Sequence, residues 1–338
     1  MIIQMVTGAN VEQVDDVVQR AKSLGFQVQL NLGTDKVVVA ILGSHTGQVP
    51  TDTFAVLPGV ESVTRIMKPY KLASREFKAE NSIVSIAGVE IGGERVVVMA
   101  GPCAVESEKQ LMEAAKAVQE AGASILRGGA YKPRTSPFSF QGLEKKGLEL
   151  LAQAREHFNI PVITEVVDPH DVSLVAKYAD ILQVGARNMQ NFALLTSVGR
   201  SKHPVLLKRG FSSTITEWLT AADYLLAEGN NQVIICERGI RTFEDSVRFS
   251  LDISSVPVIK RFSHLPVIVD PSHAAGHYSL VPAIARAAVA AGADGLLIEV
   301  HPNPKEALVD GLQSLTLSDF ARLMTELKAI AKSIGRYI

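Results

Sequence analysis

Eight short apolar segments, each followed by a stretch of helical periodicity, occupy the chain from Val96 onward. The expected strands are Val96–Ala100, Ser124–Arg127, Val162–Glu165, Ile181–Val184, Val205–Lys208, Val233–Cys236, Val267–Val269 and Gly295–Val300. The expected helices lie near residues 107–121, 143–157, 170–178, 189–199, 214–227, 253–263, 279–291 and 316–334. Eight alternating units predict an α/β chain whose parallel strands close into a (β/α)8 barrel. An open doubly wound sheet is the alternative, but no glycine fingerprint for a dinucleotide follows the first strand.

Residues 1–67 predict a separate, smaller unit with the element order β-α-β-β-α-β. Its expected strands are Ile2–Val6, Phe26–Leu32, Lys36–Leu42 and Val60–Met67, and its expected helices run from an Asn10 cap to Leu24 and near Thr51–Leu57. The first helix has an apolar stripe that would pack on one face of a four-stranded antiparallel sheet. We expect a linker at residues 68–88 and the barrel at residues 89–338. The barrel begins with a hairpin, whose turn is predicted at Gly92-Gly93, between Val89–Ile91 and Arg95–Ala100.

Composition excludes several classes of function. The formal net charge of the 338 residues is −1, so a general electrostatic attraction to nucleic acid or to an acidic membrane is not expected. No apolar run is long enough to span a membrane, and no signal peptide is evident, so we expect a cytoplasmic protein. The two cysteines, Cys103 and Cys236, are too few for a disulfide framework and are expected to be core, reactive or metal-binding thiols.

A loop after the second barrel strand has the chemistry of an anion site. It contains the cations Arg127, Lys132 and Arg134, together with the hydroxyls of Thr135 and Ser136. Two glycines in the same loop let backbone N–H groups approach a ligand closely. A solvated basic turn is the simpler interpretation, because cationic loops are common on protein surfaces.

The other strand ends favour a binding site. Each predicted strand leads into a polar or metal-ligating residue, and these are Cys103, Arg127, Glu165, Arg187, Lys208, Arg238, His273 and Glu299. Taken singly, they could be a buried thiol, a helix cap or a turn histidine. In a barrel, however, all of these strand ends converge on one mouth, where unpaired charges are costly unless a ligand or a metal balances them.

These side chains fall into two chemical groups. Six cations, Arg127, Lys132, Arg134, Arg187, Lys208 and Arg238, suit substrates that together carry a carboxylate and two phosphates. The second group offers a thiolate, an imidazole and two carboxylates to a divalent metal, from Cys103, His273, Glu299 and Asp310. Such mixed ligands suit Mn²⁺, Fe²⁺, Co²⁺ or Zn²⁺ and do not choose among them. A metal at this position would polarise a substrate carbonyl.

The motifs around these residues support a family resemblance. They are Gly101-Pro102-Cys103, Lys132-Pro133-Arg134-Thr135, Gly185-Ala186-Arg187, Leu207-Lys208-Arg209-Gly210, Glu237-Arg238-Gly239, Asp270-Pro271-Ser272-His273 and Ile298-Glu299-Val300-His301. With them, the chain from Val89 onward resembles the 3-deoxy-D-arabino-heptulosonate 7-phosphate (DAHP) synthases. It is similar to their Iβ subtype, whose ferredoxin-like regulatory domain the first 67 residues resemble.

The resemblance implies a reaction and a set of roles. The family condenses phosphoenolpyruvate with erythrose 4-phosphate, the first step of the shikimate pathway. Phosphoenolpyruvate would be held by Arg127, Lys132, Glu165, Ala186, Arg187, Lys208 and Arg238, erythrose 4-phosphate by Arg134, Thr135 and Ser136, and the metal by Cys103, His273, Glu299 and Asp310. Arg127, Lys132, Glu165 and His273 are the candidate catalytic residues. Lys132 and a metal-bound water are both candidates for the proton donor to the new alkoxide.

The resemblance also implies a homotetramer that tyrosine or phenylalanine inhibits. Because the front unit contributes nothing to the strand-end residues, regulation is its expected role. The polar side chains of Gln29 and Asn31 on its second strand are candidate contacts to such an effector at a subunit interface. A structural cap on the barrel or an oligomer clamp is the alternative.

Three other functions stay open at this point. The sister enzyme 3-deoxy-D-manno-octulosonate 8-phosphate synthase uses arabinose 5-phosphate, although its loop typically reads Lys-Ala-Asn-Arg-Ser-Ser where this chain has Lys132-Pro133-Arg134-Thr135. A Schiff-base aldolase with Lys208 as nucleophile needs no metal and leaves Cys103 and His273 unexplained. A non-catalytic sensor would bind a phosphorylated metabolite without releasing phosphate.

Overall fold

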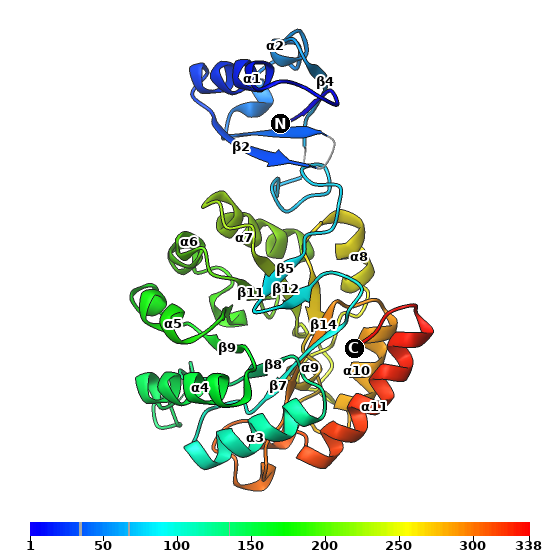
Figure 1. Cartoon of the computed structure of the whole chain (residues 1–338). Helices are drawn as coiled ribbons and strands as arrows, with labels where there is room; N and C mark the ends of the chain where they lie inside the picture. The colour runs from blue at the N-terminus through cyan, green and yellow to red at the C-terminus, as the bar shows by residue number, and fades with distance from the viewer. Residues whose placement is uncertain (34–35, 67, 135) are drawn as a thin grey trace. The chain divides into compact units, whose positions relative to one another are not determined.

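The computed structural model describes residues 1–33, 36–66, 68–134 and 136–338, and the chain divides into two compact units. Unit 1 comprises Met1–Asn81 together with Phe262–His264, and unit 2 comprises Ser82–Arg261 and Leu265–Ile338 (Figure 1). Residues 68–81 therefore pack within unit 1 and residues 82–88 within unit 2. The linker expected at 68–88, like the domain bounds on either side of it, stays a prediction.

Unit 1 is a four-stranded antiparallel sheet with helices on one face. Its strands β1 (Ile2–Met5), β2 (Gln27–Leu32), β3 (Val37–Leu42) and β4 (Val60–Thr64) lie in the order β2-β3-β1-β4. The helices are α1 (Val11–Ser23) and α2 (Asp52–Ala55), with a 3-10 turn η1 at Thr46–Gln48. Asn10 caps α1 through a reciprocal capping box with Gln13, as its sequence position indicates. The predicted βαββαβ, ferredoxin-like arrangement is confirmed.

Unit 2 is the predicted eight-stranded parallel barrel. The strands are β7 (Val97–Gly101), β8 (Ile125–Arg127), β9 (Val162–Glu165), β10 (Ile181–Val184), β11 (Val205–Lys208), β12 (Val233–Glu237), β13 (Val267–Val269) and β14 (Gly295–Glu299). They pair in sequence order, and β14 closes the ring on β7 over the register Gly295↔Val97 to Glu299↔Gly101. Nearly every strand residue is buried, as expected when helices cover a parallel sheet.

The helices surround this barrel (Figure 1). They are α3 (Glu108–Glu120), α4 (Glu144–Phe158), α5 (Val172–Tyr178), α6 (Phe192–Ser201), α7 (Ile215–Ala227), α8 (Ser255–Phe262), α9 (Pro271–Ala275), α10 (Val281–Ala290) and α11 (Leu317–Ser333). Short 3-10 turns follow several strands: η2 (Pro169–Asp171), η3 (Ala186–Asn188), η4 (Pro304–Glu306) and η5 (Gly311–Gln313). All eight expected helices are present within a few residues of their predicted ends. The short α9 was not predicted.

The hairpin before the barrel differs from the prediction. The antiparallel pair is β5 (Val84–Ile86) with β6 (Val89–Ile91), and the turn lies at Ala87 and Gly88 instead of Gly92-Gly93. Both turn residues have positive φ, 46° and 85°, and a tight turn of this kind matches the twist of two paired strands. The apolar side chains of the hairpin share one core cluster with barrel-strand residues, most of which are the first or second residue of their strand, so the hairpin covers the base of the barrel.

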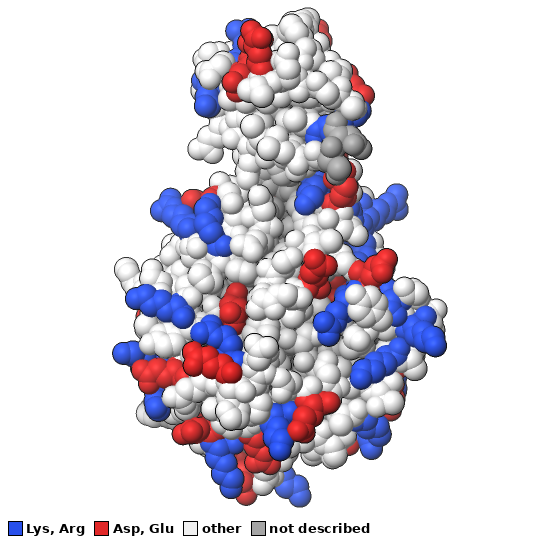
Figure 2. Space-filling view, in the orientation of Figure 1, with Lys and Arg blue, Asp and Glu red and all other residues white. Residues whose placement is uncertain are grey.

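Charges on unit 2 are mixed. On the face turned to the viewer in Figure 2, acidic and basic side chains are interspersed over the barrel. Within the described part of the chain, no helix is long and apolar enough to cross a membrane.

Candidate active site

The barrel places the predicted strand-end residues at one mouth. Arg127, Glu165, Lys208 and Glu299 are the last residues of β8, β9, β11 and β14, and all four are at least nine-tenths buried. Parallel strands in a closed barrel end on the same side, so their terminal side chains face one volume. One buried ion pair lies within this set, Arg127 Nη1 to Glu299 Oε1 at 2.9 Å, and another links the set to Asp270, Lys208 Nζ to Asp270 Oδ2 at 2.5 Å.

The four residues predicted as metal ligands come together. One donor atom from each of Cys103, His273, Glu299 and Asp310 lies within 4.8 Å of the other three. Cys103 follows β7, Glu299 ends β14, and Asp310 stands just before η5 in a left-handed conformation with φ 53°. His273 lies on α9, which Asp270 caps by accepting the His273 backbone N–H at 2.9 Å.

The electrostatics of this group suit a cation. Burial, followed by the nearby Glu299, raises the pKa of the Cys103 thiol to about 12. Burial opposes ionisation of Asp310, but His273 and Arg248 outweigh it and lower the pKa of this carboxyl to about 2. Burial lowers the pKa of His273 against the pull of Asp270. Two carboxylates and an imidazole thus face one another beside a thiol that a bound divalent cation would ionise, so the donor set fits a metal.

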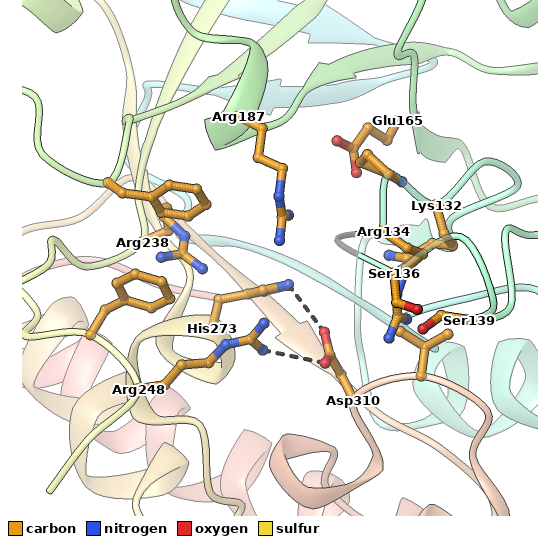
Figure 3. A pocket seen from close by; sticks show the side chains of 14 residues that line it. Lys132, Arg134, Ser136, Ser139, Glu165, Arg187, Arg238, Arg248, His273 and Asp310 are labelled. Atoms are coloured by element: carbon orange, nitrogen blue, oxygen red, sulfur yellow. Dashed lines mark ion pairs between the residues drawn. The ribbon is translucent and has the colours of Figure 1, made fainter. Parts of the chain in front are cut away.

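A cavity of about 280 Å³ opens beside the metal-ligating group (Figure 3). Its lining includes Lys132, Arg134, Ser136, Ser139, Glu165, Arg187, Arg238, Arg248, His273 and Asp310. A deeper pocket of about 40 Å³ shares part of this lining and reaches Arg127, Gly185, Ala186 and Lys208. The predicted phosphoenolpyruvate residues therefore surround the deep pocket, whereas Arg134 and Ser136 border only the outer cavity. Thr135 lies outside the described residues.

Two guanidinium groups in this cavity, those of Arg134 and Arg238, form no ion pair within the described part of the chain. The Arg238 guanidinium lies 3.9 Å from the ring centroid of Phe249 and 5.0 Å from that of Phe211, and its burial lowers the pKa to about 10. Among the described residues, neither Arg238 Nη1 nor Arg134 Nη1 has a hydrogen-bond partner. A buried N–H group without a hydrogen bond is costly, so both nitrogens are free to bind an anion that enters from outside.

Lys132 joins the two parts of the site. Its Nζ donates to the Cys103 carbonyl and to Cys103 Sγ, both at 3.1 Å, and it lines both the deep pocket and the outer cavity. Glu165 lies beside Lys132 (Figure 3), with Oε2 accepting from Gln183 at 3.4 Å. Gly185 makes room for this carboxylate, because a Cβ at that position would lie 2.0 Å from Glu165 Oε1.

Comparison with known proteins decides the family. The model of the DAHP synthetase I family matches residues 76–334, and that of the DAHP synthase ferredoxin-like domain matches residues 1–68. The chain belongs to the DAHP synthetase I family. A phospho-2-dehydro-3-deoxyheptonate aldolase of Thermotoga maritima is 48% identical over 335 residues, 99% of each chain. The activity of this chain is that of a DAHP synthase.

Solved structures and more distant relatives agree with this family. The crystal structure of the Thermotoga maritima DAHP synthase superimposes with a TM-score of 0.80 at 48% identity, covering 99% of this chain and 98% of that one. A truncated form of the Thermotoga maritima synthase gives 0.75 at 47% identity, covering 80% of this chain and 99% of that chain. A 2-dehydro-3-deoxyphosphooctonate aldolase of Geobacter sulfurreducens is 33% identical over 73% of this chain and 97% of its own. The sister activity is thus represented by a distant relative.

Several residues of this DAHP synthase site were not assigned roles from the sequence. Asp270 lies within a quoted motif, and its contacts to Lys208 and His273 follow only from the barrel register. Phe211, Arg248 and Phe249 occupy irregular segments after β11 and β12, and Gln313 ends the short turn η5 after β14. Such segments have no hydrophobic periodicity, so no sequence signal places their side chains at the mouth.

Proposed function

We propose that phosphoenolpyruvate binds in the deep pocket. Five cations meet there, Arg127, Lys132, Arg187, Lys208 and Arg238, and the pocket opens beside the metal-ligating group. This convergence is the observation that carries the proposal, because a carboxylate and a phosphate on one small molecule would balance the buried charges. The Ala186 backbone and Glu165 border the same volume. The ion pair of Lys208 with Asp270 favours a binding role for this lysine over a nucleophilic one.

Erythrose 4-phosphate is proposed to lie in the outer cavity. Arg134 and Ser136 would hold its phosphate, with Thr135 of the same loop as a further proposed contact. This arrangement points the aldehyde end inward, towards Lys132 and His273, which border both the outer cavity and the deep pocket. The distance between the two phosphates would then be set by the cavity, and the two reacting carbons would meet at its centre.

Cys103, His273, Glu299 and Asp310 would hold the metal ion. A divalent ion at this position supplies a Lewis acid that polarises the aldehyde oxygen of the sugar phosphate. C3 of phosphoenolpyruvate forms the new bond to the aldehyde carbon, water adds at C2, and the C–O bond to phosphate breaks. Burial lowers the pKa of Lys132, but Cys103 and Glu165 outweigh burial and raise it, so Nζ carries a proton beside the oxygen that becomes a hydroxyl.

An assay of phosphate release tests this proposal. Phosphoenolpyruvate is supplied with erythrose 4-phosphate or with arabinose 5-phosphate, and each reaction is run with and without chelator. We expect release that depends on erythrose 4-phosphate, stops with chelator and returns with added Mn²⁺. Faster release with arabinose 5-phosphate would contradict the proposed sugar site. Binding of phosphoenolpyruvate without any release would instead support the sensor.

For unit 1 we propose regulation by tyrosine or phenylalanine. A cavity of about 210 Å³ lies on the sheet face opposite α1, between that face and residues 75–80. Gln4, Val38 and Asn31 line it in one row across three paired strands, and Asn31 Nδ2 donates to the Phe77 carbonyl at 3.1 Å. Asn31 would thus couple binding of the amino acid to the position of residues 75–80, through its hydrogen bond to Phe77. Gln29 is not among the lining residues and stays a proposed contact at a subunit interface. We also propose that the protein is a homotetramer, and light scattering tests this.

A further inference from the structure

Each carboxylate of the metal-ligating group presents one oxygen to that group, in Glu299 the same Oε1 that pairs with Arg127, and has its other oxygen held by a residue outside the group. Glu299 Oε1 lies 3.5 Å from His273 Nε2, whereas Oε2 accepts a hydrogen bond from Gln313 Nε2 at 2.7 Å. Asp310 Oδ2 lies 3.5 Å from Cys103 Sγ, whereas Oδ1 lies 3.3 Å from Arg248 Nη1. Figure 3 shows the Asp310 carboxylate facing both His273 and Arg248. The outer oxygens of both carboxylates are therefore turned away from the centre.

The side-chain amide of Gln313 connects Glu299 with the ion pair between Arg248 and Asp310. Gln313 Oε1 accepts from Arg248 Nη1 at 2.6 Å, while its Nε2 donates to Glu299. The orientation of this amide is fixed by chemistry, because a guanidinium only donates and a carboxylate only accepts. Gln313 is 2% exposed and Glu299 is fully buried, so water does not compete for this hydrogen bond. Arg248, Gln313 and the two carboxylates thus form one continuous network.

The backbone holds this network to the element that carries His273. Arg248 N donates to the Ala275 carbonyl at 3.3 Å, and Phe249 N donates to the Ala274 carbonyl at 3.0 Å, both on α9. The turn η5 begins directly after Asp310 and ends at Gln313. Ser314 Oγ donates to the Asp310 carbonyl at 3.2 Å. The segment after β12 and the segment after β14 therefore meet at the amide of Gln313.

We propose that Gln313 is a positioning residue that keeps Glu299 a one-oxygen ligand, with Arg248 fixing the orientation of its amide. This inference rests on the proposed metal site. Without the amide, the buried Oε2 of Glu299 loses its donor, and only the ion pair of Oε1 with Arg127 at 2.9 Å still restrains the carboxylate, so Oε2 can turn towards the cation. Supporting groups of this kind typically change metal affinity by about 10- to 100-fold.

The test measures Mn²⁺ binding to chelator-treated, full-length protein by calorimetry. Gln313→Met keeps the size of the side chain and removes the amide, and Gln313→Asn keeps an amide that is too short to reach both partners. Gln232→Met is the matched control, because it removes a glutamine that donates to the Lys202 carbonyl at 2.9 Å, at the opposite end of the barrel. We expect the Kd for Mn²⁺ to rise about tenfold or more in both Gln313 variants and to stay within about twofold in the control.

Two further readouts separate positioning from folding. Thermal unfolding without metal shows whether each variant folds. If Gln313→Met does not fold, the Kd for Mn²⁺ is taken from Gln313→Asn. DAHP synthase activity of the Gln313 variants is expected to return when Mn²⁺ is raised by the same factor as the Kd. An unchanged Kd in a folded Gln313 variant, with normal binding by the wild type, overturns this inference alone. If the wild type binds no divalent metal, the proposed metal site fails with it.

Discussion

Lys132 illustrates how one residue couples two chemistries. Its ammonium group contacts Cys103 Sγ, in the metal-ligating group, and borders the pocket lined by Arg187, Lys208 and Arg238. Like charges crowded into a buried volume repel one another, so this side chain would be poorly tolerated without the thiol and Glu165 nearby. The same crowding would stabilise a trianionic ligand, as expected if this pocket binds phosphoenolpyruvate as proposed.

Replacing the thiol of Cys103 tests the metal site directly. Cys103→Ala is expected to abolish DAHP synthase activity and to leave a folded protein, because the only sulfur donor of the group is removed. Activity and Mn²⁺ affinity are measured together. Cys236→Ala is the matched control, since Cys236 is an equally buried thiol within the barrel core. The control is expected to lose stability and keep its metal affinity. Substantial activity of Cys103→Ala at saturating Mn²⁺ would reject Cys103 as a ligand.

A second substitution separates the two phosphates. Arg134→Ala is expected to raise the KM for erythrose 4-phosphate by tenfold or more, with a smaller change in the KM for phosphoenolpyruvate, because Arg134 borders only the outer cavity. Steady-state kinetics with each substrate varied in turn measures this. Arg200→Ala, on the outside of α6 and paired with Glu228, is the control and should alter neither constant. Equal increases for both substrates would mean that the phosphate sites are assigned wrongly.

At the scale of elements, the barrel could be predicted and parts of its mouth could not. Apolar runs such as Val205–Lys208 are visible in sequence because both faces of a parallel strand are buried. The turn of the hairpin was predicted at the wrong position because both Ala87-Gly88 and Gly92-Gly93 contain glycine and can form a turn. Only the observed strand pairing shows that the turn is at Ala87-Gly88. Gly92 instead lies against other backbone, where a Cβ would meet the Ser82 carbonyl at 2.3 Å. Arg248 was not predicted as a site residue because its segment has no hydrophobic periodicity.

The β5–β6 hairpin offers a test of stability without catalysis. Ile91 is fully buried among residues at the base of the barrel, so Ile91→Ala is expected to lower the free energy of unfolding by about 2–5 kcal/mol. Urea unfolding measures the loss. The KM values should be unchanged, because the site lies at the other end of the strands. Glu90→Ala, on the exposed side of the same strand, should stay within about 0.5 kcal/mol of the wild type. A similar loss in both variants would argue against a core role for Ile91.

At the scale of the molecule, each unit has a core of its own. The core of unit 1 is formed by β1, β3, α1 and α2, and that of unit 2 by the barrel interior with its hairpin. All residues of the proposed catalytic site belong to unit 2. Catalysis and the proposed regulation can therefore be separated experimentally. A ligand bound to unit 1 can change catalysis in unit 2 only if it binds two states of the protein with different affinities.

Removal of residues 1–81, the N-terminal part of unit 1, tests this separation. A chain that begins at Ser82 keeps the hairpin and every barrel strand, so it is expected to condense phosphoenolpyruvate with erythrose 4-phosphate and to lose inhibition by tyrosine or phenylalanine. Couplings between sites are typically about 1–3 kcal/mol, so the full-length enzyme should show a 5- to 150-fold change in an apparent substrate affinity with effector. Full-length Asn31→Ala leaves the barrel sequence intact and should weaken inhibition through loss of its contact to Phe77. Phosphate release against effector concentration compares the three proteins. Equal sensitivity of the truncated chain, or indifference of the full-length enzyme to both amino acids, would leave unit 1 with a structural role only.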